Sequence, residues 1–354
     1  MSIISKVLLP KKSKKDVLIT VNHPAHVHLL KNFISDLRSN NISYLIVARD
    51  KDVTLKLLKH LELDYILAPR PRLKVGYRVE ELFSRAILLN RLHREFRFRI
   101  AIGSDTSIAH VAGLPSFIIA EDDDDYTRLF GYITYPFTYR IINPINLRHS
   151  RWQNKRIFHK SYHELAYLHP DNFSPELSVL QKYGLQERKY IVVRFSALGA
   201  YHDAHAKGIT FSLWSKIKKL LKDYIIIESI EKESNNMIDP WDMHHILASA
   251  KMIIGDSQTM TIEGAVLGVP SFRINTFVGK SSILQELEEK YQLAIGILPH
   301  EERSILDKIN ELLTSKDIEE IWKCRRQRLL VDKVDFNQWL IRFFSKYLYG
   351  ELES

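Results

Sequence analysis

The chain has 354 residues, of which 45% are hydrophobic and 26% are charged, proportions typical of a globular protein long enough for two domains. Its single cysteine, Cys324, excludes a disulfide framework and a cysteine-built metal site, and it favours a reducing compartment, by default the cytoplasm. The formal net charge of +9 predicts an anionic partner, which could be a nucleic acid, a sugar nucleotide or an anionic membrane face. No apolar run of about 18 residues is present, so a membrane-spanning segment is not expected.

The first half of the chain alternates strand and helix patterns. Apolar runs predict strands at 16–21, 43–48, 65–67, 99–102 and 116–120. Helical spacing of apolar residues predicts helices at 27–38 and 53–61, and a short helix between the last two strands. This alternation predicts an α/β fold with a doubly wound parallel sheet.

Three histidines, His23, His26 and His28, follow the first strand. The carboxyl end of a parallel strand is where a ligand lies, and a histidine there could serve near neutral pH as acid, base or phosphate partner. The segment can also be a capped helix start led by Pro24. His26 and His28 would point roughly 160° apart on a helix, so no metal site is expected from this segment.

Residues 70–99 combine many arginines with apolar residues at helical spacing. Such a basic amphipathic helix could make peripheral contact with the anionic inner face of a membrane, or it could be a core-packed helix with a charged outer face. Nucleic-acid binding is not expected, because the interleaved aromatic residues and recognised motifs of nucleic-acid readers are missing.

Polar residues follow the next two strands of the first half. Asp105, in Gly103-Ser104-Asp105-Thr106, could cap a helix or contact a ligand. Five adjacent carboxylates, Glu121 to Asp125, follow the strand at 116–120. Mutual repulsion would raise the pKa of any member that is removed from water, which suits acid/base work, although a solvated acidic loop or a divalent cation site would also explain the run.

A proline-containing linker near 168–175 separates two halves, so domains are predicted at 1–168 and 169–333. The second half has predicted strands at 190–195, 224–227 and 251–254. Residues 334–354 contain an aromatic amphipathic helix that is expected to pack across the domain boundary, back onto the first domain.

The strand at 190–195 ends in residues suited to a diphosphate. Arg194 could neutralise the phosphates, and the small-residue turn from Ser196 to Gly199 would allow close backbone approach. His202 would then border the cleft between the domains.

The segment from Gly255 to Arg273 reads as strand, turn, helix and strand. The helix begins at the turn formed by Asp256 and Ser257, where unpaired backbone N–H groups favour a phosphate. Glu263 lies roughly 9 Å further along the helix axis, within reach of the ribose of a nucleoside diphosphate. Simple helix capping with a solvated glutamate is the alternative interpretation.

Together these segments resemble the GT-B superfamily of sugar-nucleotide enzymes. They resemble most closely a family known only as a domain of unknown function, related to the non-hydrolysing UDP-N-acetylglucosamine 2-epimerases and to glycosyltransferases. The signatures are Val21 to His28, Val192 to His202 and Gly255 to Pro270. The resemblance implies two Rossmann-like domains facing a cleft, with the second domain binding the nucleotide.

The epimerases carry a D-S-G-G-x-x-E-E-x-x-x-L-G-x-P segment that holds UDP. Ser257 and Glu263 match it, whereas Gln258 and Thr259 replace its two glycines, which leaves the base of the nucleotide open. The same comparison nominates Asp105, Glu121 and Asp125 as acid/base residues. The epimerases' G-T-R-P-E segment is replaced by Asn22-His23-Pro24-Ala25, and loss of that Arg–Glu pair argues against the same epimerisation.

The resemblance therefore implies a GT-B glycosyltransferase, of the kind used in cell-surface polysaccharide biosynthesis, with a nucleotide-sugar donor and a saccharide or lipid-linked acceptor. His26, Glu121 or Asp125 would deprotonate the acceptor hydroxyl. An epimerase-like enzyme that acts on a nucleotide sugar and a non-catalytic sugar-nucleotide-binding protein are the alternatives. No metal and no cofactor beyond the nucleotide sugar is expected, and the location would be cytoplasmic, with peripheral contact at the membrane.

Overall fold

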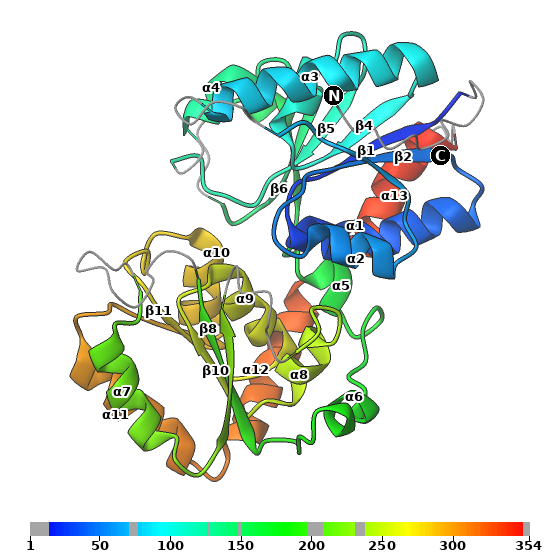
Figure 1. Cartoon of the computed structure of the whole chain (residues 1–354). Helices are drawn as coiled ribbons and strands as arrows, with labels where there is room; N and C mark the ends of the chain where they lie inside the picture. The colour runs from blue at the N-terminus through cyan, green and yellow to red at the C-terminus, as the bar shows by residue number, and fades with distance from the viewer. Residues whose placement is uncertain are drawn as a thin grey trace, which may run out of the picture.

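The computed structural model describes residues 14–70, 77–125, 128–147, 151–196, 208–230 and 238–349. The chain forms two α/β domains, each built around one parallel sheet, with the C-terminal helix α13 (Phe336–Leu348) lying beside the first sheet (Figure 1). The predicted α/β class and paired Rossmann-like units are confirmed.

The N-terminal sheet has seven strands in the order β3-β2-β1-β4-β5-β6-β7. β1 (Val17–Val21) is an apolar strand buried along its whole length, as expected where helices cover both faces of a parallel sheet. The other strands are β2 (Tyr44–Ala48), β3 (Tyr65–Leu67), β4 (Ile100–Gly103), β5 (Ser116–Ile119), β6 (Arg140–Pro144) and β7 (Arg156–His159). β6 and β7 were not predicted from the sequence.

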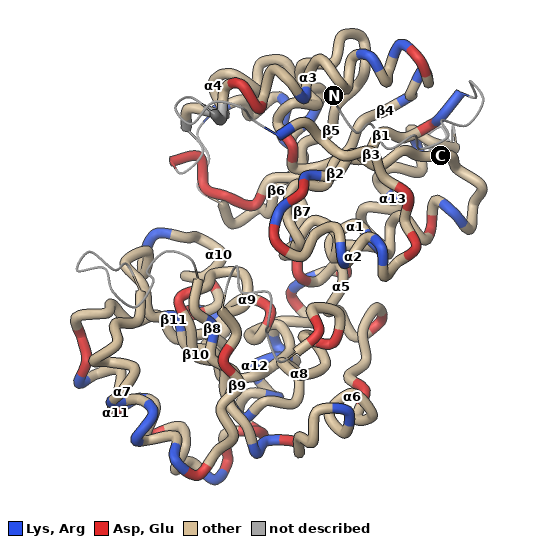
Figure 2. Tube along the Cα trace, in the orientation of Figure 1, with Lys and Arg blue, Asp and Glu red and all other residues tan. Residues whose placement is uncertain are grey.

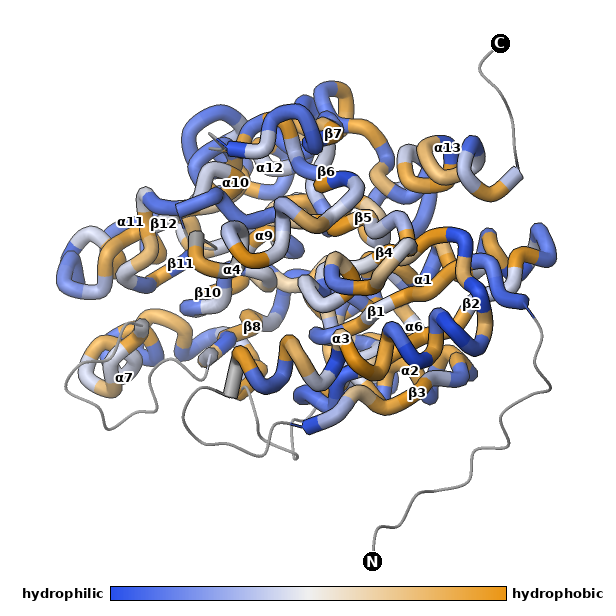
Figure 3. The backbone as a smooth tube through the Cα atoms, turned by 90° about the horizontal axis from the view of Figure 1, so that it is seen from above, coloured by the Kyte–Doolittle hydropathy of each residue, from blue (hydrophilic) through white to orange (hydrophobic). Residues whose placement is uncertain are grey.

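The helices of this domain are α1 (Pro24–Ser39), α2 (Thr54–His60), α3 (Tyr77–Phe96), η1 (Thr106–His110), α4 (Arg128–Thr134) and η2 (Gln153–Lys155). α3 lies on the outside of the domain and alternates apolar with polar residues (Figure 3). None of the helices in the described part of the chain is both long enough and apolar enough to span a bilayer.

The C-terminal sheet has five strands in the order β12-β11-β10-β8-β9. Its strands are β8 (Tyr190–Phe195), β9 (Ile225–Ile230), β10 (Met252–Gly255), β11 (Ser271–Ile274) and β12 (Ala294–Ile297). Its helices are α6 (Leu177–Lys182), α7 (Phe211–Leu220), α8 (Met243–Ser249), α9 (Gln258–Leu267), α10 (Ser282–Gln285), η3 (Glu286–Lys290), α11 (Glu302–Thr314) and α12 (Ile318–Asp332). The short helix α5 (Leu165–Leu168) lies at the junction, where it packs on α1 and α13 and also contacts α9.

In both sheets the strand order reverses next to the first strand, between β1 and β4 and between β8 and β10. Crevices at such reversal points, outside the carboxyl ends of the strands, bind ligands in open α/β sheets. The topology therefore places a candidate site where the two reversal points face each other.

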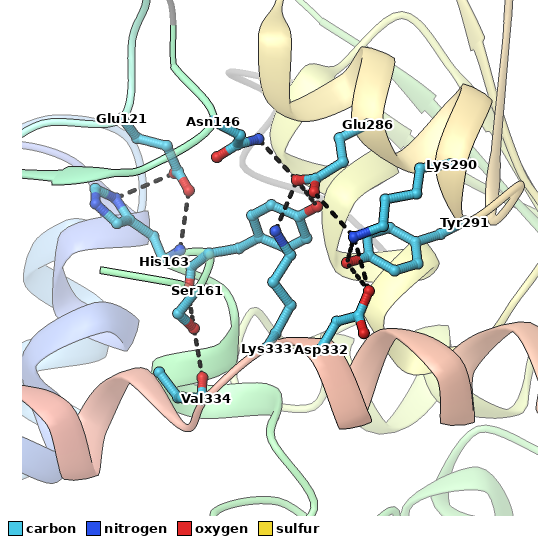
Figure 4. A network of polar contacts seen from close by, with 11 residues as sticks. Glu121, Asn146, Ser161, His163, Glu286, Lys290, Tyr291, Asp332, Lys333 and Val334 are labelled. Atoms are coloured by element: carbon cyan, nitrogen blue, oxygen red, sulfur yellow. Dashed lines mark hydrogen bonds and ion pairs between the residues drawn. The ribbon is translucent and has the colours of Figure 1, made fainter. Parts of the chain in front are cut away.

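The chain crosses between the domains twice, and the two crossings are hydrogen-bonded to each other. The backbone N–H of Val334 donates to Lys160 O at 2.9 Å, and Ser161 Oγ donates to Val334 O at 2.5 Å (Figure 4). Beyond this point α13 packs on the N-terminal domain, with the ring of Phe344 5.5 Å from Phe33 and 5.0 Å from Phe117. Two paired crossings give the domains a defined mutual orientation.

Glu286, a residue of the C-terminal domain beside the crossings, accepts hydrogen bonds from both domains. Glu286 Oε2 accepts hydrogen bonds from Asn146 Nδ2 at 2.8 Å, Tyr162 OH at 2.5 Å and Lys333 Nζ at 2.7 Å (Figure 4). The charge-assisted contact to Lys333 is stronger than a neutral hydrogen bond. This network holds the two domains together at the base of the cleft.

Candidate functional site

The two domains enclose a cavity of about 550 Å³ that both contribute to. The C-terminal domain lines one part with the apolar side chains of Ile230, Ile238, Pro240 and Met243, which suit the faces of a nucleobase. The polar residues of the C-terminal domain that line it are Arg194, Ser196, Ser229, His244, Asp256, Ser257, Gln258, Thr259 and Glu263, and those of the N-terminal domain are His23, His28, Asp52 and Lys56. We call this the nucleotide cavity.

The polar end of the nucleotide cavity is built by the turn between β10 and α9. Ser257 caps α9, and its side chain accepts a hydrogen bond from Met260 N at 3.4 Å. Asp256 accepts from Ser196 N at 2.6 Å, which joins this turn to the end of β8. Gly255 is required here, because a Cβ would lie 2.6 Å from Arg194 O. The turn is thus held rigidly, and the first N–H groups of α9 open toward the cavity.

Arg194 stands at the same end of the cavity. Its Nη1 donates to Ser229 Oγ at 2.7 Å, which orients the guanidinium from the neighbouring strand β9. The structure therefore brings Arg194, Ser196 and the turn from Asp256 to Thr259 together in one cavity. Gly199 and His202 lie outside the described residues.

Glu263 lies deeper in the nucleotide cavity and is only 7% exposed. Its Oε1 accepts a hydrogen bond from Tyr167 OH at 2.9 Å and lies 3.0 Å from His244 Nε2. His28 packs against both of these partners, with ring centroids 4.5 Å from His244 and 5.4 Å from Tyr167. The carboxylate is thus fixed by side chains that the sequence did not suggest, and it is not a solvated helix residue.

A second cavity of about 390 Å³ adjoins the first and shares His23, Ala25 and Thr259 with it. Three carboxyl groups, those of Glu121, Asp122 and Glu164, line it. Its other polar walls are His23, His26, Ser104, Thr106, Tyr135, His163, Tyr167 and Thr259. We call this the acidic cavity.

Glu121 and His163 form a close pair in the acidic cavity. Glu121 Oε1 accepts the backbone N–H of His163 at 2.9 Å, and Oε2 lies 3.1 Å from His163 Nδ1 (Figure 4). A carboxylate at Nδ1 fixes the proton on that nitrogen and leaves Nε2 as an acceptor. His163 Nε2 has no partner among the described residues. The pair has the geometry of a base and its orienting group.

The pKa values of the other two carboxyl groups of the acidic cavity are raised, most clearly that of the buried Glu164, whereas Asp122 is an exposed residue. Glu164 is 3% exposed, its Oε2 has no partner among the described residues, and burial followed by the charge of Glu121 raises its pKa well above the ordinary value. Burial and the charge of Glu121 also raise the pKa of Asp122. The expected pKa rise within the run Glu121–Asp125 is thus found at Asp122.

The histidines at the start of α1 have partly structural roles. His23 caps the helix by accepting from Ala25 N at 3.2 Å, and His26 Nδ1 accepts from Asn22 N at 3.3 Å. Burial, reinforced by His23 and His163, lowers the pKa of His26 to about 3. His26 is therefore neutral with its proton on Nε2, which makes it a hydrogen-bond donor and a poor base.

The remaining members of the acidic run do not line either cavity. Asp123 accepts from Ser282 N at 2.8 Å and Ser282 Oγ at 2.6 Å, so it binds the start of α10 across the domain interface. Asp124 pairs with Arg156 Nη2 at 2.5 Å. Asp125 is exposed. In Figure 2 the run is a continuous acidic segment between β5 and α4 that faces the C-terminal domain.

Asp105, the other acid/base nominee, is buried outside both cavities. Its Oδ1 accepts from Ser107 N at 2.9 Å and so caps η1, and its Oδ2 lies 3.1 Å from Arg85 Nη1. Arg85 also pairs with Glu81. The structure therefore places Asp105 in a buried ion pair that fastens α3 to the sheet.

The described residues contain one group with metal-ligand spacing, which is formed by His169, Asp171 and Asp335 with their ligand atoms within 4.8 Å. None of them lines a cavity, and Asp335 Oδ1 already accepts from Asn337 N and Gln338 N as the cap of α13. This group has no part in the site.

His163, Glu164, Tyr167 and His244 were missed from the sequence. The first three follow β7, a strand that the sequence pattern did not predict, and polar residues after a parallel strand face the ligand. Recognising Arg156–His159 as a strand would have nominated Ser161 to Glu164 as site residues.

Residues 15–342 match a family described as "Protein of unknown function (DUF354)". The chain belongs to this family. No curated protein sequence matches this DUF354 chain.

Solved structures show the same fold across almost the whole DUF354 chain. The UDP co-structure of MnaA from S. aureus has a TM-score of 0.68 at 10% identity, covering 96% of this chain and 99% of its own. The UDP-GlcNAc 2-epimerase from Neisseria meningitidis, bound to UDP-GlcNAc, has a TM-score of 0.62 at 11% identity, covering 95% and 100%. The spinosyn forosaminyltransferase SpnP has a TM-score of 0.62 at 15% identity, covering 94% and 100%. The DUF354 chain thus shares the GT-B architecture of epimerases and glycosyltransferases.

Proposed function

We propose that this protein is a sugar-nucleotide-dependent glycosyltransferase of the GT-B type. The observation that supports it most is the adjacency of two cavities of different chemistry, which share His23, Ala25 and Thr259 in their walls. One cavity has the apolar wall, the arginine and the helix start that suit a nucleoside diphosphate. The other has the carboxyl and imidazole groups that suit proton transfer at a sugar or an acceptor hydroxyl.

On the nucleotide side, Arg194 and the first N–H groups of α9 would bind the diphosphate. Both also stabilise the negative charge that grows on the diphosphate as its bond to the anomeric carbon breaks. The N–H donors at the start of α9 do not have to move during the step, because the turn at Asp256 and Ser257 already holds them in position. The electron pair of the broken bond leaves with the nucleoside diphosphate.

On the acidic side, the Glu121–His163 pair would take the proton of the acceptor hydroxyl as its oxygen attacks the anomeric carbon. The pair is preorganised, because Glu121 holds both the backbone and the ring of His163. His26, with its low pKa, is assigned to hydrogen-bond donation. Asp105 and Asp125 receive no role in this mechanism, because neither lines a cavity.

An epimerase-like activity on the nucleotide sugar is the second candidate. It is favoured by the presence of two unlike carboxyl groups in the acidic cavity, Glu121 paired with His163 and Glu164 with a raised pKa. One acid and one base on either side of a sugar could remove and return a proton.

We also propose that the acceptor is presented at an anionic membrane surface, which α3 contacts. Among the α3 side chains that the structure describes, those at exposed positions are Val79, Phe83, Ile87, Arg91 and Arg94, so an apolar stripe continues into two cations without a carboxylate among these exposed residues. Exposed Leu129 and Tyr132 of α4 add to the apolar surface. Apolar insertion flanked by arginine is the pattern that binds anionic lipid.

Sedimentation with vesicles of phosphatidylcholine, with and without phosphatidylglycerol, tests this contact. Wild type should bind only the anionic vesicles, and the Phe83→Ser, Ile87→Ser double variant should lose binding. A matched control, Leu177→Ser and Val331→Ser, removes two exposed apolar residues of the C-terminal domain and should keep it. If both double variants bind the anionic vesicles equally well, α3 does not contact the membrane.

The catalytic proposal is tested by incubating the protein with UDP-, dTDP-, GDP- and ADP-sugars and a lipid extract as acceptor. A transferase releases the nucleoside diphosphate and labels the acceptor, whereas an epimerase-like enzyme isomerises the sugar nucleotide without release. Release without labelling, or binding without any product, would contradict transfer.

A further inference from the structure

The charge of the acidic cavity restricts the sugar that it can accept. Among the described residues that line it, Glu121, Asp122 and Glu164 carry carboxyl groups and none is a lysine or an arginine. Among the described arginines near this cavity, Arg156 pairs with Asp124 and Arg85 pairs with Asp105. A second anion would therefore find neither a lysine nor an arginine among the described residues that line the cavity.

Glu164 is the most distinctive of the three carboxyl groups. It is almost completely buried, yet its Oε2 has no hydrogen-bond partner among the described residues. A buried polar atom of this kind costs stability unless a ligand satisfies it. A protonated carboxyl group donates to an uncharged oxygen such as a sugar hydroxyl or an acetamido carbonyl.

Resting on the proposed function, we infer that the acidic cavity binds an uncharged hexose or N-acetylhexosamine, that Glu164 donates a hydrogen bond to it, and that the cavity rejects a hexuronate. A carboxylate on the sugar would meet Glu121 at short range inside a cavity from which water is largely displaced. Like charges repel much more strongly there than in water. The same carboxyl groups thus select the substrate and perform the chemistry.

The experiment is calorimetric titration with UDP, UDP-glucose and UDP-glucuronate, or with the matching GDP, dTDP or ADP set if that base binds. UDP alone reports the nucleotide cavity and is the internal reference. The neutral sugar nucleotide should bind at least about tenfold more tightly than the uronate, because the two differ only in a charged group placed beside carboxylates. Equal or tighter binding of the uronate, with the nucleoside diphosphate still bound, overturns the inference and leaves the proposed function intact.

Four variants assign the effect to the cavity. Glu121→Gln removes the charge that the uronate would meet and should narrow the ratio between neutral sugar and uronate, whereas Asp125→Asn, which removes an exposed carboxylate of the same run, should leave it unchanged. Glu164→Gln replaces one uncharged donor with another and should leave the affinity for the neutral sugar near that of wild type, whereas Glu164→Leu removes the donor and should weaken it. If Glu121→Gln leaves the ratio unchanged, selection does not come from this carboxyl group, and if Glu164→Leu binds the neutral sugar as tightly as wild type, Glu164 does not donate to it. If none of the four nucleoside diphosphates binds, the proposed function fails and this inference fails with it.

Discussion

The nucleotide cavity and the acidic cavity share a wall and both contain carboxyl and imidazole groups, but only the first contains cationic side chains among its described lining residues. The nucleotide cavity combines apolar side chains with Arg194, Lys56 and the N-terminus of α9, whereas the acidic cavity is lined by three carboxyl groups and several imidazoles without a lysine or an arginine. A positive end suits diphosphate binding, and clustered acids and bases suit proton transfer. The difference teaches that binding and chemistry are separated in space, so substitutions on the two sides should have separable effects.

The largest effect is expected from Glu121→Gln. Loss of the carboxylate that orients His163 should lower kcat by about 10²- to 10⁴-fold, while the affinity for the nucleoside diphosphate should not change, because Glu121 lies outside the nucleotide cavity. Asp125→Asn, which lines neither cavity, is the matched control and should retain activity. A Glu121→Gln protein with full turnover would show that the acidic cavity does not perform the chemistry.

Arg194→Ala should weaken binding in the nucleotide cavity. Loss of a charge-assisted hydrogen bond to phosphate costs about 1.5–3 kcal/mol, which corresponds to roughly a 10- to 100-fold weaker affinity for the nucleoside diphosphate. Arg303→Ala, an exposed arginine on α11 of the same domain, controls for the general loss of positive charge. If Arg194→Ala and Arg303→Ala bind the nucleoside diphosphate with the same affinity, the diphosphate does not bind at Arg194.

Ser257→Ala separates a structural from a binding role in the same residue. Removing this cap of α9 should cost about 1 kcal/mol of stability, measured by chemical denaturation, and should also weaken nucleotide binding. Thr210→Ala removes the equivalent cap of α7, where the side chain accepts from Leu213 N at 3.2 Å, and should cost similar stability with no loss of binding. If Ser257→Ala and Thr210→Ala bind the nucleotide with equal affinity, Ser257 only caps α9 and does not bind the nucleotide.

The smallest effect is a pH dependence at Glu164. Its folded pKa is raised above an unfolded value near 4.3, so the folded state binds more protons, and this group lowers the unfolding free energy as pH rises from about 4.3 toward the folded pKa. Glu164→Gln removes that decline. The stability difference between variant and wild type should therefore shift in favour of the variant as pH increases, and a constant difference across the series would contradict a protonated Glu164.

The fold could be predicted from local patterns where strands are apolar and helices are capped. The segment from Gly255 to Arg273 was predicted correctly as strand, turn, helix and strand, because Gly255, the Ser257 cap and Gly268 act within their own turn. β7 was missed because it is short, lies at the sheet edge and carries Arg156 and His159 at its ends. Edge strands lack the continuous apolar run that identifies central ones.

The site could be predicted only in part, because local sequence patterns do not show which residues meet across the domain interface. The five carboxylates from Glu121 to Asp125 look alike as a run, yet Asp123 reaches Ser282 of the other domain and Glu121 reaches His163. Likewise, Glu263 meets Tyr167 nearly a hundred positions away. Burial and tertiary partners, which differ between adjacent residues, decide these roles.

A crystal structure of the protein with the tightest-binding nucleoside diphosphate sugar, in a non-cleavable phosphonate form, tests the central claim most directly. The two cavities predict the diphosphate at Arg194 and the start of α9, with the sugar ring in the acidic cavity between Glu121 and Glu164. A nucleotide bound elsewhere, or a sugar ring that points away from the three carboxyl groups, would contradict a single sugar-nucleotide site spanning both cavities.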